Sequence, residues 1–339
     1  MGGLSRRYVK VMEMKSQGKN PIILDAGDFF FSTTKLNKNN IESEKHRAGA
    51  ILEGYNRIGC DAINIGKYEL LNGLSFLREM SNKTEIPFLS ANLRDSKTKE
   101  LLFQPYKIIE RGELSLGVIG ITSLLPDTFT TVVGDDYIQS GNKYIKELSE
   151  KTDVIIMLVN TDRASQKDLA ENFKNADFII TSGSTNLTRP NAPQKEGGPY
   201  MFSCGKQGKY LMVLDVKMKD DSQPFVNVSN HEKKINNVIK RFNRLQKKDP
   251  DKTLEEIYKD QTNILKLINQ YRLDLKASED AISQAKNTIG YNTIGLNKKI
   301  TDDPGILSFV NKSLSVCDSL NPNVKDLKNA KIDHSGHNH

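Results

Sequence analysis

Polar residues stand directly after several short apolar runs of the sequence. Asp28 follows one run, residues 67–69 follow the next, and Asn160 ends a later one. Side chains placed beyond the carboxyl ends of parallel strands meet at one edge of an α/β sheet, as in a catalytic or binding rim. Asp and Asn are equally ordinary as turn formers and helix caps, so spacing alone leaves both interpretations open. The rim candidates are Asp28, Lys67, Tyr68, Glu69, Asn92, Asn160, Asp162, Ser184 and Asn186.

The apolar runs alternate with amphipathic helical patterns from residue 5 to about residue 228. Short continuous apolar runs of this kind, each preceded by helical periodicity, predict strands buried on both faces. Three final runs follow one another without helices between them, so we expect antiparallel strands to close a layered α/β sandwich. The predicted strands lie within 21–28, 61–66, 88–93, 116–122, 153–160, 177–181, 200–204, 210–217 and 224–228.

The sequence changes character near His231. Residues 231–284 are rich in Lys, Asn, Asp and Glu, with apolar residues at helical spacing and a break at Asp249-Pro250. We therefore expect a helical hairpin or helical extension over 229–320, with segment 231–285 available to a protein partner. A membrane-surface helix, the alternative, would have a stronger apolar face and fewer acids. Residues 321–339, which contain His334, His337 and His339, are predicted to be a disordered tail.

Composition excludes several classes of function. The net charge is +7, from 49 basic and 42 acidic residues. Without a dense Arg tract or a stripe of basic and aromatic residues, this mild excess does not indicate binding to a nucleic-acid polymer. The three cysteines are far apart and form neither a zinc motif nor a haem motif. No apolar stretch is long enough to span a bilayer, and the N-terminal residues do not resemble a signal peptide.

Several segments resemble one enzyme family in order and spacing. They are Gly2–Arg7, Gly18–Pro21, Leu24–Phe30, Tyr55–Gly66, Asp153–Val159 and Asp177–Asn186. Together they resemble the calcineurin-like metallophosphoesterases of the 5′-nucleotidase and UDP-sugar hydrolase type. The resemblance implies a layered α/β/β/α sandwich over residues 1–228, and a periplasmic or exported protein. It also implies that the family's first strand, with its Asp-x-His ligands, would precede this sequence.

The resemblance also assigns roles to the rim residues. The family holds two divalent metal ions with Asp, Asn and His side chains, and the metal pair activates water for phosphoryl transfer. Asp28 matches the bridging carboxylate. The other matched positions differ from the family pattern: Lys67 replaces a metal-binding Asn, Tyr68 the catalytic His, Asn160 a later His, and Ser184 and Asn186 two further His.

Histidines are scarce in the rest of the chain. Outside the tail they are His46 and His231, and neither follows a predicted buried strand. A dinuclear site built on imidazoles cannot be assembled from them. An ammonium at Lys67 beside Asp28 would instead replace a metal by a tethered charge, unless Lys67 points into solvent.

Two functional hypotheses from different classes follow. The first is a catalytically silent member of the family, used as a binding or scaffold module and needing no cofactor. The second is a residual phosphoesterase acting on nucleotides with Mn, Zn, Fe or Mg. Weak binding of Ni²⁺ or Zn²⁺ by the His-containing tail is a third, minor possibility. The second hypothesis would use Asp28, Glu69, Asn92, Asn160 and Asp162 as its site.

Overall fold

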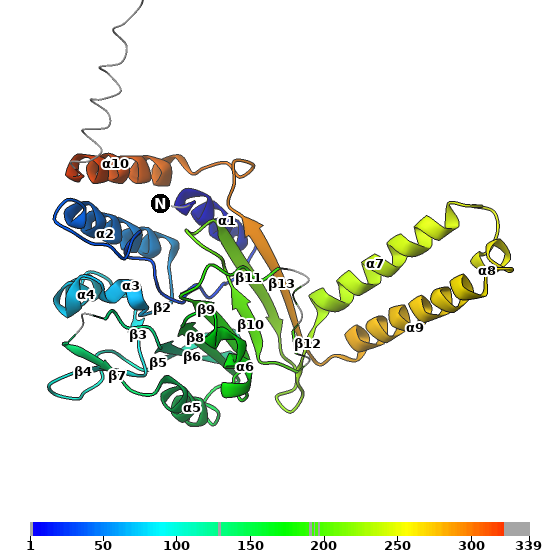
Figure 1. Ribbon diagram of the computed structural model, residues 1–339, viewed down its shortest axis with the longest axis horizontal. Helices are drawn as coiled ribbons and strands as arrows, with labels where there is room; N and C mark the ends of the chain where they lie inside the picture. The colour runs from blue at the N-terminus through cyan, green and yellow to red at the C-terminus, as the bar shows by residue number, and fades with distance from the viewer. Residues whose placement is uncertain (1–2, 128–129, 190–191, 193, 196, 322–339) are drawn as a thin grey trace, which may run out of the picture. The chain divides into compact units, whose positions relative to one another are not determined.

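The computed structural model describes residues 3–127, 130–189, 192, 194–195 and 197–321. The chain divides into two compact units, the second formed by residues 189–198 and 212–293 and the first by the remainder. The predicted layered α/β fold with helices toward the C-terminus is confirmed (Figure 1). The predicted borders at residues 228 and 320 stay a prediction, and the His-containing tail lies outside the described residues.

The first unit contains two main sheets. A three-stranded parallel sheet has the order β1-β2-β3, and a five-stranded sheet has the order β10-β9-β8-β6-β5. β4 and β7 form a separate antiparallel pair. The strands are β1 (Leu24–Asp25), β2 (Ala62–Asn64), β3 (Phe88–Leu89), β4 (Leu93–Asp95), β5 (Tyr106–Arg111), β6 (Leu114–Thr122), β7 (Val132–Gly134), β8 (Val154–Asn160), β9 (Phe178–Ser182) and β10 (Tyr200–Ser203).

Helices cover these sheets and bury their apolar faces against them. α2 and α4 pack on the first sheet around Phe30, Ile63 and Leu77, and α5 packs on the second around Met157 and Phe173. α10 lies against α1 and α2 (Figure 1). The helices are α1 (Leu4–Ser16), α2 (Ile41–Ile58), α3 (Lys67–Leu70), α4 (Gly73–Ser81), α5 (Tyr137–Leu148), η1 (Ser165–Lys167), α6 (Leu169–Asn172) and α10 (Pro304–Leu320).

One prediction about the sheet is wrong. β10 pairs with β9 in parallel, with Tyr200 opposite Phe178, and so does not close the sheet as an antiparallel strand. The connection from β9 to β10 is long enough to return to the starting edge, which a parallel neighbour requires. The antiparallel strand of this sheet is instead β5, at the opposite edge.

The second unit combines a small sheet with a helical hairpin. Most of a three-stranded sheet of order β11-β13-β12 falls in this unit. The predicted hairpin is present, but residues 287–295 form a strand where the prediction had helix. No helix among the described residues could span a bilayer. The elements are β11 (Tyr210–Lys217), β12 (Phe225–Asn227), β13 (Asn287–Gly295), α7 (Val228–Gln246), α8 (Leu254–Ile257) and α9 (Thr262–Gln284).

The close approach of β6 to β3 gives a test of the first unit. A Cβ added at Gly120 would lie 2.6 Å from the carbonyl oxygen of Leu89 and 2.7 Å from Asn64 Oδ1. Because backbone cannot move aside cheaply, we expect Gly120→Ala to lower the free energy of unfolding by about 1–3 kcal/mol. Gly49→Ala is the control: its nearest neighbour is Met80 Cε at 3.8 Å, so the substitution should stabilise α2 by about 0.5–1 kcal/mol. Urea unfolding that finds the two variants equally stable would contradict this packing.

Candidate functional site

The loop that follows β1 has a strained backbone at Asp28. Its φ is 69°, in the left-handed region that residues other than glycine rarely adopt, and Gly27 before it has a φ of 96°. Asp tolerates this region better than most residues, but the conformation still has to be imposed by its surroundings. The surroundings that impose it come from the loop after β2.

Glu69 fixes the conformation of this loop through hydrogen bonds to its backbone. Its side chain is fully buried, and its two carboxylate oxygens accept the backbone N–H groups of Asp28, Phe29 and Phe30 at 2.8, 2.8 and 3.1 Å. The same carboxylate accepts the N–H of Gly66 at 2.8 Å, just before α3. One side chain therefore binds four backbone donors and locks the loops after β1 and β2 together.

Asp28 and Asn160 meet directly, as the positions of their strands predict. Asn160 Nδ2 donates to Asp28 Oδ2 at 2.8 Å and to Ser182 Oγ at 2.8 Å. Asp28 Oδ1 accepts the backbone N–H of Tyr68 at 2.9 Å, and the N–H of Gly183 also bonds to this carboxylate. The structure thus brings the ends of β1, β2, β8 and β9 to one site in the first unit.

Lys67 takes part through its backbone and not through its ammonium. Its N–H donates to Asn160 Oδ1 at 3.1 Å. Within the described residues, no ion pair joins Lys67 to Asp28, so the hypothesis of a tethered charge replacing a metal is wrong. The partners of the Asp28 carboxylate are amide N–H groups, which supply dipoles instead of a full charge.

The remaining predicted rim residues do not contact Asp28. Asn92 is buried and bonds to the backbone of Thr122 and Asp135. Asp162 is exposed and caps its own turn by accepting from residues 164–165. Ser184 Oγ and Asn186 Nδ2 both donate to Gln166 Oε1, at 3.1 and 2.9 Å. These residues shape the loops around the site without joining it.

Three contributors were missed by the sequence reasoning. Ser182 Oγ accepts from Asn160 and donates to the carbonyl oxygen of Ala26 at 2.6 Å, which joins β9 to β1. Gln166 holds the loop after β9. Asp25, inside β1, accepts from the hydroxyl of Tyr55 at 2.5 Å. Ser182 directly follows the predicted strand 177–181, which is a signal that could have been used, whereas nothing in the sequence pattern indicates Gln166.

Burial and like charge govern the titration of this site. Burial raises the pKa of Glu69 to about 7, with a further contribution from the nearby Asp28 charge, against the lowering effect of its hydrogen bonds. Burial also raises the pKa of Asp28. Burial, and then the charge of Asp28, raises the pKa of the Tyr68 phenol, which therefore stays neutral and cannot act as a base near neutral pH.

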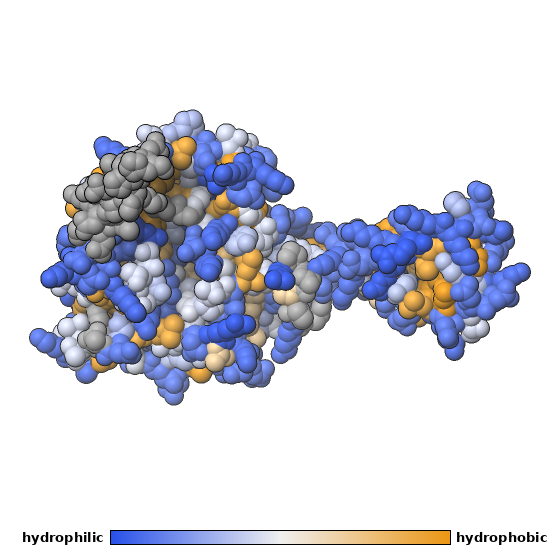
Figure 2. Space-filling view, turned by 45° about the horizontal axis from the view of Figure 1, so that its top comes forward, coloured by the Kyte–Doolittle hydropathy of each residue, from blue (hydrophilic) through white to orange (hydrophobic). Residues whose placement is uncertain are grey.

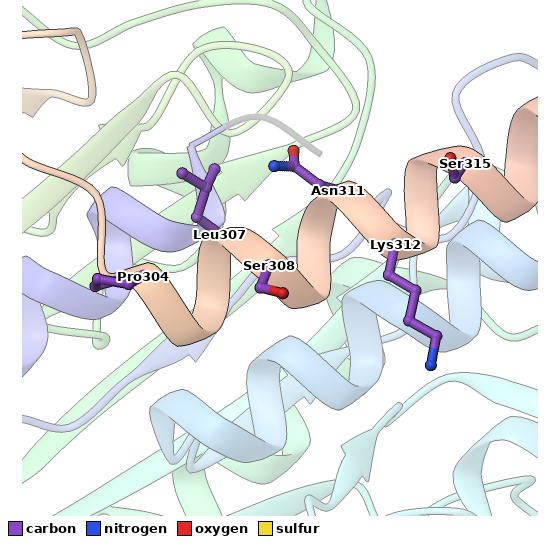
Figure 3. Close-up of a pocket in the computed structure, with 6 residues that line it drawn as sticks. All are labelled: Pro304, Leu307, Ser308, Asn311, Lys312 and Ser315. Atoms are coloured by element: carbon purple, nitrogen blue, oxygen red, sulfur yellow. The ribbon is translucent and has the colours of Figure 1, made fainter.

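A surface hollow along α10 does not offer a second site. The residues that line it all belong to this one helix, and Figure 3 shows Leu307 and Asn311 on one side of the helix and Lys312 on the other. Their side chains do not converge on a common point, and they include no carboxylate. The polar groups able to do chemistry are at the strand ends.

Known proteins resemble this chain in sequence and in fold. No family model matches the sequence. Protein UshA of Salmonella pullorum is 27% identical over 250 residues, which cover 63% of this chain and 44% of the relative. The 5′-nucleotidase of Rattus norvegicus is 27% identical over 247 residues, covering 65% and 42%. The chain thus spans less than half the length of these curated relatives.

A solved structure resembles nearly the whole chain. The calcineurin-like phosphoesterase YfkN of Bacillus subtilis superposes with a TM-score of 0.59 at 17% identity, covering 93% of this chain and 89% of that one. The chain has the fold of the calcineurin-like phosphoesterases, and its sequence is similar to those of 5′-nucleotidases. The fold class is therefore established, and the roles of the individual rim residues stay predictions.

The donor set does not fit the two metal ions that this family implies. Within the described residues, no group of three or more His, Cys, Asp or Glu side chains is placed to hold a metal ion. At Asp28 the oxygen lone pairs point at N–H donors, and Asn160 presents its Nδ2 to the carboxylate while its Oδ1 accepts from Lys67. An amide nitrogen does not ligate these metals, so the matched positions Asp28 and Asn160 satisfy each other instead.

The four N–H groups bound by Glu69 give the first test of the site. Gln at this position has one acceptor oxygen, so two buried backbone donors lose their partner in Glu69→Gln. We expect the free energy of unfolding to fall by about 2–6 kcal/mol, at 1–3 kcal/mol for each unsatisfied group. Glu79→Gln, which changes an exposed carboxylate on α4, is the control and should be nearly neutral. Chemical denaturation giving the same small change for both variants would contradict the bracing role of Glu69.

The coupling of the two carboxylates gives a second test, with a definite sign. The pKa of Glu69 is about 7 in the folded protein against an ordinary 4.5, so the folded state keeps a proton that the unfolded chain releases. Stability should therefore fall as the pH rises through this window. Asp28→Asn removes the like charge, lowers the pKa of Glu69 and should make the fall shallower. Buried Asp177, with a pKa of about 6, contributes equally to both proteins and cancels. The free energy of unfolding is measured by urea denaturation at pH 5, 6, 7 and 8. The same dependence on pH in the natural chain and in Asp28→Asn would contradict the coupling.

Proposed function

We propose that this chain is a 5′-nucleotidase-like protein that has lost metal-dependent hydrolysis and acts as a binding or scaffold module. The observation that carries the proposal is the hydrogen bond from Asn160 Nδ2 to Asp28 Oδ2. An amide hydrogen there occupies the lone pair that a bridging metal ion would need. Loss of the metal would remove both the activated water and the positive charge on which phosphoryl transfer by two metals depends.

The other matched positions support the same proposal. Tyr68 stands at the position of the catalytic His, and its raised pKa keeps the phenol protonated near neutral pH. Within the described residues of the first unit, His46 bonds neither to Asp28 nor to Asn160. General acid or base catalysis near neutral pH is most often done by a group that titrates there, and imidazole is the usual choice.

The binding role is assigned to the helical segment 231–285. It forms most of α7, α8 and α9, whose apolar residues pack mainly on each other. Export to the periplasm or beyond is part of the proposal and is supported by the family resemblance alone. Protease protection of the natural full-length protein in intact cells, compared with lysed cells, tests the location.

Metal content and hydrolysis test the proposed loss of activity. The protein truncated after residue 333, so that the tail histidines are absent, should contain no stoichiometric Mn, Zn or Fe by elemental analysis. With added Mn²⁺, Zn²⁺ or Mg²⁺ it should not release phosphate from AMP or cleave UDP-glucose above the level of Asp28→Asn. That variant serves as the control because it removes the bridging carboxylate.

Two results would overturn this proposal. One is about two metal ions per truncated chain. The other is nucleotide hydrolysis that disappears in Asp28→Asn, which would restore the alternative of a residual metal-dependent phosphoesterase. Lys67→Asn combined with Tyr68→His should not restore hydrolysis, because Asn160 and the loop at 184–186 still lack imidazoles.

A further inference from the structure

The helix α7 separates its charges from its apolar residues. Val238 is buried, Phe242 and Leu245 pack in the apolar cluster of the hairpin, and the exposed cations extend from the edge of this apolar stripe to the far side of the helix. At 100° per residue the cations occupy an arc of about 140°. Within α7 the only acidic residue is Glu232. The exposed cations on α7 and directly after it are Lys234, Lys240, Arg241, Arg244, Lys247 and Lys248.

Three of these cations recur every seven residues along the border of the apolar stripe. Lys234 and Arg241 lie above each other about 10 Å apart along α7, and Lys248 follows in the turn directly after the helix ends at Gln246. The Arg241 guanidinium lies 4.8 Å from the ring centre of Tyr271, and the Lys248 ammonium lies 5.1 Å from that of Tyr258. These contacts hold two of the three charges in place.

Among the described residues, no carboxylate forms an ion pair with a member of this line. The ion pairs that the described hairpin contains join Lys252 to Asp249 and Arg272 to Glu255, and neither includes a member of the line. Uncompensated cations beside an apolar seam resemble the flanking positions of a helical bundle, where opposite charges on the next helix select the partner.

The apolar seam beside the line is only partly covered. Of the cluster inside the hairpin, Leu254, Tyr258 and Ile268 are buried, and the rest are partly exposed. Leu267 on α9 is 43% exposed. Figure 2 shows apolar side chains at the surface of the hairpin, with hydrophilic residues around them. Two helices leave such a stripe half open, and a third helix would cover it.

We propose that this side of the hairpin binds one amphipathic helix of a protein partner, with acidic residues seven apart beside its apolar stripe. The inference rests on the binding role proposed above and adds the chemistry of the partner. A second copy of the chain would bring the same line of cations and repel it. Base stacking is disfavoured because Arg241 and Lys248 cover the tyrosine rings. Membrane insertion is disfavoured because the arc of about 140° that the cations occupy contains no apolar residue.

The test uses a labelled peptide of about three heptads, with Leu at the seam positions and Glu on both flanks. The full chain should bind it, as measured by fluorescence anisotropy. Replacing Lys234, Arg241 and Lys248 together by Glu should weaken binding about tenfold or more, since three favourable pairs become repulsive. The matched control replaces Lys240, Arg244 and Lys247 by Glu. It changes the net charge equally on the same helix and should cost about threefold or less.

A charge-reversed peptide shows whether weaker binding by the variant is caused by misfolding. The same peptide with Lys on its flanks should bind the variant with Glu at 234, 241 and 248 better than it binds the natural chain. Equal losses in both triple variants, or failure of this rescue, would overturn the proposal. So would tighter binding of a uridine oligonucleotide, or of vesicles of phosphatidylcholine and phosphatidylglycerol, than of the acidic peptide. Nucleotide hydrolysis with peptide binding intact would overturn the proposed loss of activity while supporting this inference.

Discussion

The carboxylate of Glu69 is the fixed point around which the rest of the site is arranged. A buried carboxylate is costly unless its lone pairs are used, and here four backbone N–H groups use them. Those four donors come from the loops after β1 and β2. They hold Asp28 in a left-handed conformation that it would not adopt alone, and so aim its carboxylate at the ends of β8 and β9. The geometry of Asp28 therefore depends on a fully buried side chain.

This arrangement places the carboxyl groups of Asp28 and Glu69 close enough for the charge of Asp28 to raise the pKa of Glu69. Dipoles from Asn160, Tyr68 and Gly183 stabilise the charge on Asp28, but they do not cancel it. Protonation removes the remaining unfavourable charge, and the pKa values of both carboxyl groups are therefore raised. The amide N–H groups thus supply part of the stabilisation that a full positive charge would otherwise give to Asp28.

The sequence was sufficient for the framework and for the central contact, because both follow from apolar runs and what comes after them. Asp28 and Asn160 each stand at the end of a buried strand, and parallel strands bring such ends together. The sequence could not show that Lys67 contributes its N–H and not its ammonium. That choice depends on how α3 is oriented by Glu69, which is a tertiary contact.

The failure to predict β5 and β13 also has a physical reason. β5 alternates exposed and partly buried residues at a sheet edge, and β13 reads Asn-Thr-Ile-Gly-Tyr-Asn-Thr-Ile-Gly, with few consecutive apolar residues. Neither resembles the continuous runs of the central strands. β10 was recognised as a strand, but its direction is set by the long connection before it. Local patterns carry no information about direction.

The hairpin differs from the rim in how its polar and charged groups are paired. At the rim, hydrogen bonds between residues far apart in sequence join Asp28 to Asn160 and to Tyr68. On the hairpin, two helices bury one stripe between them, and α7 keeps a line of cations with no carboxylate opposite it among the described residues. A surface that is complete on its own would pair those charges or spread them evenly around the helix. Their alignment beside a half-covered seam is what an absent helix of opposite charge would require, and this is why we place the binding role on the hairpin instead of on the inherited site.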